Sequence, residues 1–237
     1  MIYKSVNKGW INDSPSLPLH MLTKAIISEN DMENIELHTN TLLGDSILND
    51  DKNEEYLENG KYYSYYYLFS KHVKPKVIAE IGTRLGYSLI SLIKGNQGNV
   101  EKIYSYDLEE YIHGSSEKAK ANIERETGFM NTKFHRCNTQ EINDLGLEDN
   151  TIDVFNVDGD HTKNGALHDL EMAYKATKSG GYILFDDIVG SVDENGAGTR
   201  SWGDDLRDAG IEFCTKYNLD FVFLPTLRGL MVIHIIK

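Results

Sequence analysis

Two short segments of this sequence end in acidic residues whose types and spacing suit metal-assisted chemistry. One segment, VDGDH, places Asp158 and His161 three residues apart. The other places Asp186 and Asp187 directly after an apolar run, with Asp186 28 residues beyond Asp158. That interval fits one helix-containing crossover between parallel strands, and neighbouring strands lie about 4.8 Å apart. We therefore expect these side chains to converge at the carboxyl edge of a sheet.

Three crowded carboxylates repel one another unless a cation or protons compensate their charge. Asp158, Asp186 and Asp187 offer only oxygen atoms, which favours a hard ion, Mg²⁺ or Mn²⁺. His161 is the expected catalytic base because imidazole accepts a proton near neutral pH, and Asp158 is expected to share in catalysis. A bound ion would also ease the loss of a hydroxyl proton. The alternative for each residue taken singly is a solvated acidic turn or strand end.

A glycine-containing loop is the predicted start of a cofactor site. The segment EIGTRLGYS places Glu80, Gly82 and Gly86 in the spacing ExGxxxG, between a strand and a helix. Glycine permits close backbone approach to a ligand, and open α/β sheets bind ligands beyond the carboxyl ends of their strands. An acid at the start of the loop would repel the pyrophosphate that GxGxxG loops bind. It suits a cofactor with a cationic amino-acid end, and Thr83 and Ser88 belong to the same predicted site.

Polar residues after later strands complete the predicted cofactor site. Asp107 lies 21 residues after Gly86, where an acid can accept hydrogen bonds from both hydroxyls of a ribose. Asn138 is expected to contact an adenine edge, and Asp158 is expected beside the cofactor. With the glycine loop, these residues favour S-adenosylmethionine, as in class I methyltransferases. The alternative is a tight turn and a solvated Asp107.

The elements that must position these residues alternate between strand and helix. Five segments are expected to be parallel strands: 77–82, 101–107, 132–137, 151–157 and 182–186. Gly180-Gly181 is expected to end the helix that runs over 164–178. The last two strands, 221–226 and 229–236, are too close for a crossover and must form an antiparallel hairpin. The pattern predicts an α/β, Rossmann-like doubly wound sheet with helices on both faces.

Residues 1–70 differ from the rest of the chain and are interpreted as an N-terminal helical cap or lid segment, followed by a methyltransferase domain at 71–237. The first part contains a tyrosine cluster, whose members are Tyr62, Tyr63, Tyr65, Tyr66 and Tyr67. We favour an amphipathic helix that packs on the core. An aromatic lid, or a contact between subunits of a homo-oligomer, is the alternative.

The composition and the start of the sequence limit the classes of partner that the protein is expected to bind. The formal net charge of −13 argues against nucleic acid, whose binding relies on Lys and Arg. No apolar run approaches the roughly 20 residues of a membrane-spanning helix. The start, MIYKSVNKGW, lacks the apolar core of a signal peptide, so we expect a cytoplasmic protein without membrane contact. Cys137 and Cys214 form no CxxC pair. A small molecule or a sugar is the expected substrate.

The motifs EIGTRLGYS, YSYD, VDGDH and SGGYILFDD occur in this order and resemble the macrocin O-methyltransferase and cephalosporin-hydroxylase-like branch of class I methyltransferases. The resemblance covers roughly 75–237. It implies a seven-stranded Rossmann-like fold, a substrate-side loop at 188–203 and sugar hydroxyls of natural products as acceptors. It also implies three Mg²⁺ ligands and a catalytic base, namely Asp158, Asp186 and Asp187 with His161. The sequence departs from the class at Cys137-Asn138, where an Asp is often found.

We therefore predict an S-adenosylmethionine-dependent O-methyltransferase that uses a divalent metal. An NAD-dependent Rossmann oxidoreductase is the alternative enzyme, although the missing third glycine of GxGxxG and the acidic Glu80 speak against it. A non-catalytic S-adenosylmethionine-binding scaffold is the other alternative. The intact acidic segments speak against that one.

Overall fold

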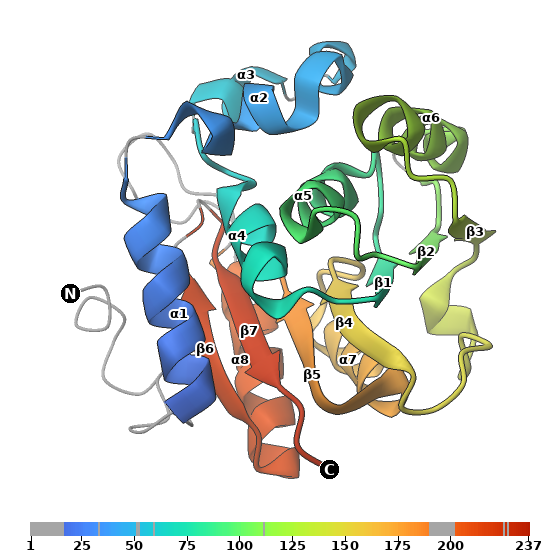
Figure 1. The fold of residues 1–237 in the computed structure, drawn as a ribbon. Coiled ribbons are helices and arrows are strands. Elements are labelled where there is room, and N and C mark those ends of the chain that lie inside the picture. The colour runs from blue at the N-terminus through green and yellow to red at the C-terminus, as the bar shows by residue number, and fades with distance from the viewer. Residues whose placement is uncertain are drawn as a thin grey trace. The chain divides into compact units, whose positions relative to one another are not determined.

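The strands of the chain form one mixed α/β sheet. The computed structural model describes residues 17–32, 34–50, 53–58, 60–110, 112–189, 202–224, 226 and 228–237. Among these residues seven strands are hydrogen-bonded in the order β3-β2-β1-β4-β5-β7-β6 (Figure 1). The predicted Rossmann-like doubly wound sheet is confirmed. Two compact units make up the chain, Lys24–Asn138 and a second one that joins Met1–Thr23 to Thr139–Lys237.

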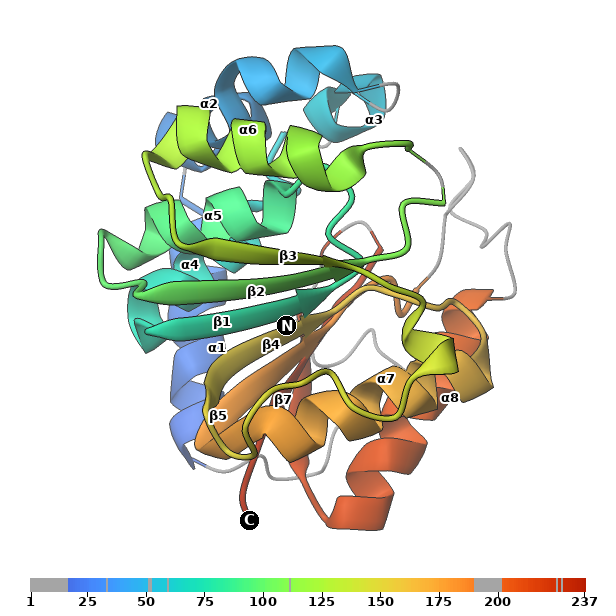
Figure 2. The same cartoon turned by 90° about the vertical axis from the view of Figure 1, so that its right-hand side faces the viewer.

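The unit Lys24–Asn138 contains three parallel strands. These are β1 (Val77–Ile81), β2 (Lys102–Asp107) and β3 (Thr132–Arg136). The strands pair in the order β1-β2-β3, and helices α5 (Tyr87–Asn96) and α6 (Ser115–Thr127) lie on one side of them (Figure 2). Because β1 and β2 run parallel in register, the glycine loop after β1 and Asp107 at the end of β2 emerge at the same edge.

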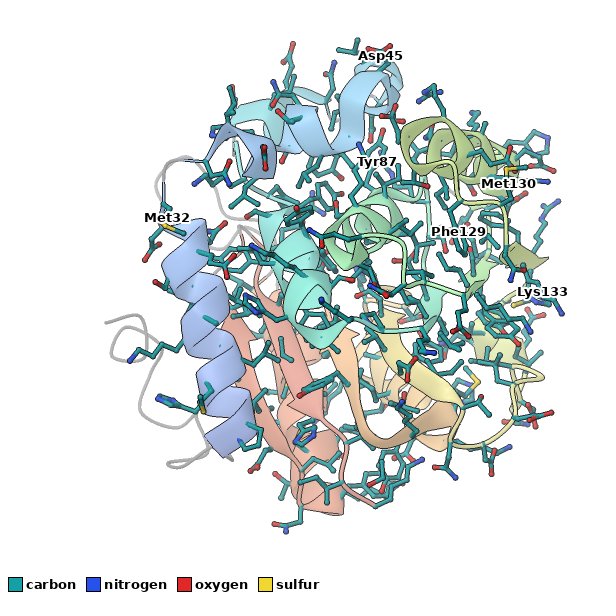
Figure 3. The ribbon with its side chains drawn as sticks, in the orientation of Figure 1. Met32, Asp45, Tyr87, Phe129, Met130 and Lys133 are labelled. Carbon is teal, nitrogen blue, oxygen red and sulfur yellow. The ribbon has the colours of Figure 1, made fainter. Side chains whose placement is uncertain are left out.

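Short helices precede β1 in this unit. They are η2 (Ile35–Leu37), α2 (Thr39–Leu43), η3 (Gly44–Asn49), α3 (Asn53–Glu58) and α4 (Ser64–Val73). Four tyrosines of the cluster are buried here, and Tyr67 is half-buried. Tyr63 packs against Tyr56 and Tyr87, with ring centroids 5.6 and 5.9 Å apart. Tyr87, at the start of α5, is labelled in Figure 3. The interpretation of the cluster as core packing is therefore confirmed.

Helices α4 and α5 touch at Gly95. A Cβ atom at this position would clash with the backbone carbonyl of Tyr67. We expect Gly95→Ala to lower the free energy of unfolding by about 3 kcal/mol, because neither backbone can give way without disturbing the packing. Urea denaturation measures the change. Gly98→Ala is the control, since nothing lies within 4 Å of its added Cβ and only its positive φ of 90° is unfavourable. A loss at Gly95 no larger than that at Gly98 would contradict the close contact.

The other unit contains two parallel and two antiparallel strands. They are β4 (Ile152–Val157), β5 (Thr177–Phe185), β6 (Asp220–Leu224) and β7 (Leu230–His234). Strand β4 pairs parallel with β5, whereas β7 pairs antiparallel with both β5 and β6. The predicted closing hairpin is confirmed. Helix α7 (Lys163–Ala176) packs against β4, β5 and α8 (Trp202–Tyr217).

Two helices have not yet been placed, η4 (Thr139–Glu141) and α1 (Leu17–Asn30). Helix η4 precedes β4. Helix α1 contributes residues to both compact units. In the part of the chain that the structure describes, no helix has both the length and the apolar character needed to cross a membrane.

The expectation that Gly180-Gly181 ends a helix is wrong. Helix α7 ends at Ala176, where the hydroxyl of Thr177 donates a 2.7 Å hydrogen bond to the carbonyl of Ala173. The two glycines lie inside β5 instead. A Cβ at Gly181 would sit 2.8 Å from the carbonyl oxygen of Asp153 in β4. Gly181 thus serves a close approach between neighbouring strands, and neither glycine ends the helix.

Candidate active site

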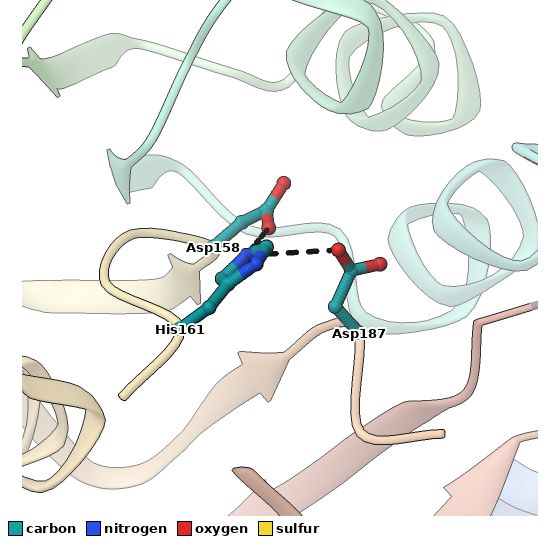
Figure 4. Close-up of side chains that lie close together, drawn as sticks. All are labelled: Asp158, His161 and Asp187. Atoms are coloured by element: carbon teal, nitrogen blue, oxygen red, sulfur yellow. Dashed lines mark ion pairs between the residues drawn. The ribbon is translucent and has the colours of Figure 1, made fainter. Parts of the chain in front are cut away.

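Three side chains converge after β4 and β5 (Figure 4). Asp158 follows β4 directly, His161 lies in the next turn, and Asp187 is the second residue after β5. The Nε2 atom of His161 is 3.6 Å from Asp158 Oδ1 and 3.6 Å from Asp187 Oδ2. One ligand atom from each of the three side chains lies within 4.8 Å of the others. The acidic cluster defined by Asp158, His161 and Asp187 is the candidate active site of this unit.

Asp186 does not belong to this set of three, although it was predicted as a metal ligand. Its Oδ1 atom accepts a 2.8 Å hydrogen bond from the backbone N–H of Asp187. Asp187 has a left-handed φ of 59°, so the chain turns sharply after Asp186. A ligand role for Asp186 stays a prediction, whereas His161 joins the cluster by geometry.

Burial and mutual repulsion shift the pKa values of the residues in the cluster. Burial, followed by the charge of Asp158, raises the pKa of Asp187 to about 6. Burial and the charge of Asp186 likewise raise the pKa of Asp158. Burial alone would lower the pKa of His161, but the charges of Asp158, Asp187 and Asp186 outweigh it and raise that pKa. The site therefore favours a cation, because a positive charge is what its carboxylates lack.

The donor set fits a divalent ion. The two carboxylates offer oxygen ligands and the imidazole offers a nitrogen ligand. This set suits Mn²⁺ when the histidine ligates. When His161 is left free as a base, Asp158 and Asp187 offer the pair of carboxylates with which Mg²⁺ is usually bound. Asp187 is nearly buried, with 5% of its side chain exposed, whereas 34% of the Asp158 side chain reaches solvent. An ion can thus be approached from the Asp158 side.

Asp160 has a structural role in the same segment. Its carboxylate accepts a 2.7 Å hydrogen bond from the N–H of Thr162, whose hydroxyl accepts one from Gly165 and caps α7. The buried Asp169 of α7 accepts hydrogen bonds from Gln140 and from the N–H of Asp160. Burial raises the pKa of Asp169 to about 6. The acidic-turn alternative therefore holds for Asp160, and the turn fixes where Asp158 and His161 stand.

The glycine loop after β1 is the candidate cofactor element of the other unit. Gly82 and Gly86 have φ of 85° and 82°, values that favour glycine. Glu80 is fully buried and accepts a hydrogen bond from the hydroxyl of Ser88. The hydroxyl of Thr83, 3% exposed, is 2.6 Å from that of Ser105 in β2. The loop is thus fixed by side chains on β1, β2 and α5.

Asp107 binds the same loop. Its Oδ2 accepts a 2.7 Å hydrogen bond from the N–H of Arg84, and its Oδ1 accepts bonds from the N–H of Glu109 and the hydroxyl of Ser115. The predicted ribose contact stays a prediction, to which the structure adds a role in loop geometry. Asn138 follows the end of β3 by two residues and is half-buried, so its adenine contact also stays a prediction.

Sequence reasoning missed the ion pair between Arg84 and Asp50. Arg84 lies in the glycine loop with a left-handed φ of 47°. Both terminal nitrogens of its guanidinium lie 2.7 Å from the carboxylate of Asp50, whose side chain is fully buried. The pair ties the loop to the segment after η3. The two residues are 34 positions apart, and no local pattern links them.

Two comparisons of the sequence with known proteins found similar proteins. Residues 79–188, which contain the glycine loop and the acidic cluster, match the family described as a methyltransferase domain. An uncharacterised protein of Acanthamoeba polyphaga mimivirus is 31% identical over 118 residues, which are 46% of this chain and 49% of that protein. The chain thus spans about half the length of the curated relative it matches.

Solved structures share the fold. The S-adenosylhomocysteine-bound methyltransferase of Podospora anserina superposes with a TM-score of 0.60 and 16% identity, covering 94% of this chain and 98% of that one. The O-methyltransferase of Bacillus cereus, in complex with S-adenosylhomocysteine, gives 0.57 and 18%, covering 92% and 100%. The chain thus has the Rossmann-like fold of these methyltransferases, and its residues 79–188 match the methyltransferase-domain family.

Proposed function

We propose that this protein is an S-adenosylmethionine-dependent O-methyltransferase that requires a divalent cation. The observation that carries the proposal is the convergence of Asp158, His161 and Asp187 after two strands of a methyltransferase fold. The fold shared with the Bacillus cereus O-methyltransferase supports oxygen as the atom that accepts the methyl group. The narrower assignment to the macrocin O-methyltransferase branch, with a sugar hydroxyl as acceptor, rests on the sequence motifs alone.

The methyl donor is proposed to bind at the glycine loop. Gly82 and Gly86 leave the backbone open to close approach, and Asp107 offers acceptor oxygens to the ribose hydroxyls. The negative charge of Glu80 suits the ammonium of the methionine end, and Ser88 orients that carboxylate. The negative charge of Glu80 would repel a pyrophosphate. The antiparallel β7 also departs from the usual order of dinucleotide-binding sheets, which disfavours the NAD alternative.

The reaction moves one methyl group and one proton. S-adenosylmethionine would supply the methyl group and leave as S-adenosylhomocysteine, with a methyl ether as the other product. His161 would receive the hydroxyl proton on Nε2, and Asp158 and Asp187 would hold the cation. When bound, the cation lowers the pKa of the acceptor hydroxyl. The neighbouring carboxylates stabilise the protonated imidazole, because two of their oxygens lie 3.6 Å from that nitrogen. The remaining rate enhancement comes from placing the acceptor oxygen in line with the methyl carbon and the sulfonium sulfur.

Turnover in the presence and absence of a chelator tests the proposal. The purified protein is incubated with S-adenosylmethionine and a panel of small-molecule and sugar hydroxyls, and release of S-adenosylhomocysteine is measured. We expect EDTA to abolish release and added Mg²⁺ or Mn²⁺ to restore it. Full activity in EDTA would reject the metal requirement. Failure to bind S-adenosylhomocysteine, or its displacement by NAD, would reject the methyltransferase itself.

A further inference from the structure

We propose that Arg228 is a built-in counter-charge of the acidic cluster that sets its affinity for a divalent cation. The inference rests on the metal requirement proposed above. Arg228 lies in the connection between β6 and β7, and its Nη1 is 3.4 Å from Oδ2 of Asp187. The same oxygen is 3.6 Å from Nε2 of His161. Arginine thus approaches the oxygen that faces the cluster.

The position of Arg228 is fixed by its backbone. Its carbonyl accepts a 2.7 Å hydrogen bond from the N–H of Val189, and the carbonyl of Gly229 accepts one from Ile188. Gly229 has φ of 79°, and a Cβ there would lie 2.9 Å from a side-chain carbon of Ile188. The connection between β6 and β7 is therefore fastened to the segment that carries Asp187. Only 13% of the Arg228 side chain is exposed, so solvent screens its charge weakly.

Arg228 adds a positive charge to a cluster that otherwise favours a cation. Asp158 and Asp187 contribute two negative charges when ionised, and Arg228 places one positive charge beside the Asp187 carboxylate. A guanidinium cannot ligate a metal, because every polar hydrogen it carries is a donor. It therefore acts in two opposed ways: it stabilises buried Asp187 when no ion is bound, and it repels an arriving cation.

These two opposed effects predict a gain in cation affinity when Arg228 is neutralised, which structural damage alone would not produce. Removal of the positive charge should tighten ion binding, whereas a disordered site would bind the ion more weakly. We expect Arg228→Gln to bind Mn²⁺ about tenfold more tightly than the parent protein in a calorimetric titration without methyl donor. In EDTA the variant should have a lower Tm than the parent. Its Tm should also rise more steeply as Mn²⁺ is added.

Control variants separate the local charge from general effects. Arg228→Lys keeps the charge, so its Mn²⁺ affinity should stay within about threefold of the parent. Lys178→Gln removes the same charge from the start of β5, where Lys178 pairs with Asp153, and should leave the affinity within about twofold. Arg228→Met keeps the apolar stem of the side chain and replaces Arg228→Gln if the latter does not fold.

The possible outcomes are distinguishable. Tighter Mn²⁺ binding by the neutral variants, with unchanged binding by Lys178→Gln, supports the inference. Unchanged or weaker binding by the neutral variants, while the parent binds Mn²⁺, overturns it and leaves the proposed function intact. If the parent itself binds no Mn²⁺ or Mg²⁺, the metal requirement fails together with the inference. Binding of S-adenosylhomocysteine by the parent would still support a methyltransferase in that case.

Discussion

Replacement of Asp187 with alanine is expected to abolish cation-dependent methyl transfer, lowering turnover by about 10³-fold. Asp187 contributes a nearly buried carboxylate to the set that also contains Asp158 and His161. Loss of an ion that polarises the acceptor removes several kcal/mol of transition-state stabilisation, and about 4 kcal/mol corresponds to that factor. Turnover at saturating S-adenosylmethionine measures the effect. Calorimetry should show that S-adenosylhomocysteine binding changes by less than about threefold.

Two variants of neighbouring residues make this result specific. Asp160→Asn alters another acid of the VDGDH segment, whose carboxylate accepts a hydrogen bond from the N–H of Thr162, so turnover should fall by less than about fivefold. Asp186→Ala removes the carboxylate that accepts the N–H of Asp187 and tests the ligand role predicted from sequence. A loss as large as that of Asp187→Ala, with Mn²⁺ binding also lost, would establish Asp186 as a ligand. Full turnover by Asp187→Ala would contradict the proposed cation site.

Much of the fold was predictable because its signals are local. Apolar runs with helical segments between them marked the parallel strands, and the short connection before β7 required an antiparallel pair. The glycine pair of β5 shows where local signals fail. Gly180-Gly181 is equally compatible with a helix end and with close strand pairing, and only the neighbouring backbone of Asp153 distinguishes the two. Pattern alone cannot supply a contact between distant segments.

The candidate active site was predictable to the level of segments. Spacing placed Asp158 and Asp187 at the ends of neighbouring strands, but the turn at Asp187 decides which carboxylate faces His161. A backbone dihedral of this kind is not readable from residue types. Arg228 joins the cluster from the β6–β7 connection, 41 residues beyond Asp187, without a motif that announces it. Charged residues that pair across distant segments can be identified only when the fold is known.

Some predictions concern residues for which the structure gives no description. The substrate-side loop predicted at 188–203 falls largely in 190–201, which lies outside the described residues. The expected cap at 1–70 likewise includes 1–16. The identity of the acceptor therefore rests on the motifs and on activity measurements, whereas the methyl-donor and cation sites can be tested residue by residue.

Replacement of Asp107 with alanine is expected to weaken S-adenosylhomocysteine binding by about 100-fold, or about 2.7 kcal/mol. Two effects add. The ribose hydroxyls lose their proposed acceptor, and the N–H groups of Arg84 and Glu109 lose a carboxylate partner 2.7 and 2.6 Å away. Hydrogen bonds to charged groups contribute about 1.5–3 kcal/mol each. Part of the lost binding free energy therefore reflects a less ordered glycine loop. A calorimetric titration measures the affinity.

Two further variants divide that loss between the ribose contact and the loop. Ser115→Ala removes one donor to Asp107 and leaves its carboxylate in place, so the affinity should fall by less than about threefold. Asp107→Asn keeps one carbonyl oxygen, which can serve the N–H of Arg84 or a ribose hydroxyl but not all donors at once. Its affinity should fall between those of the parent and Asp107→Ala. Binding by Asp107→Ala within about threefold of the parent would mean that neither effect operates, and the ribose would have to be bound elsewhere.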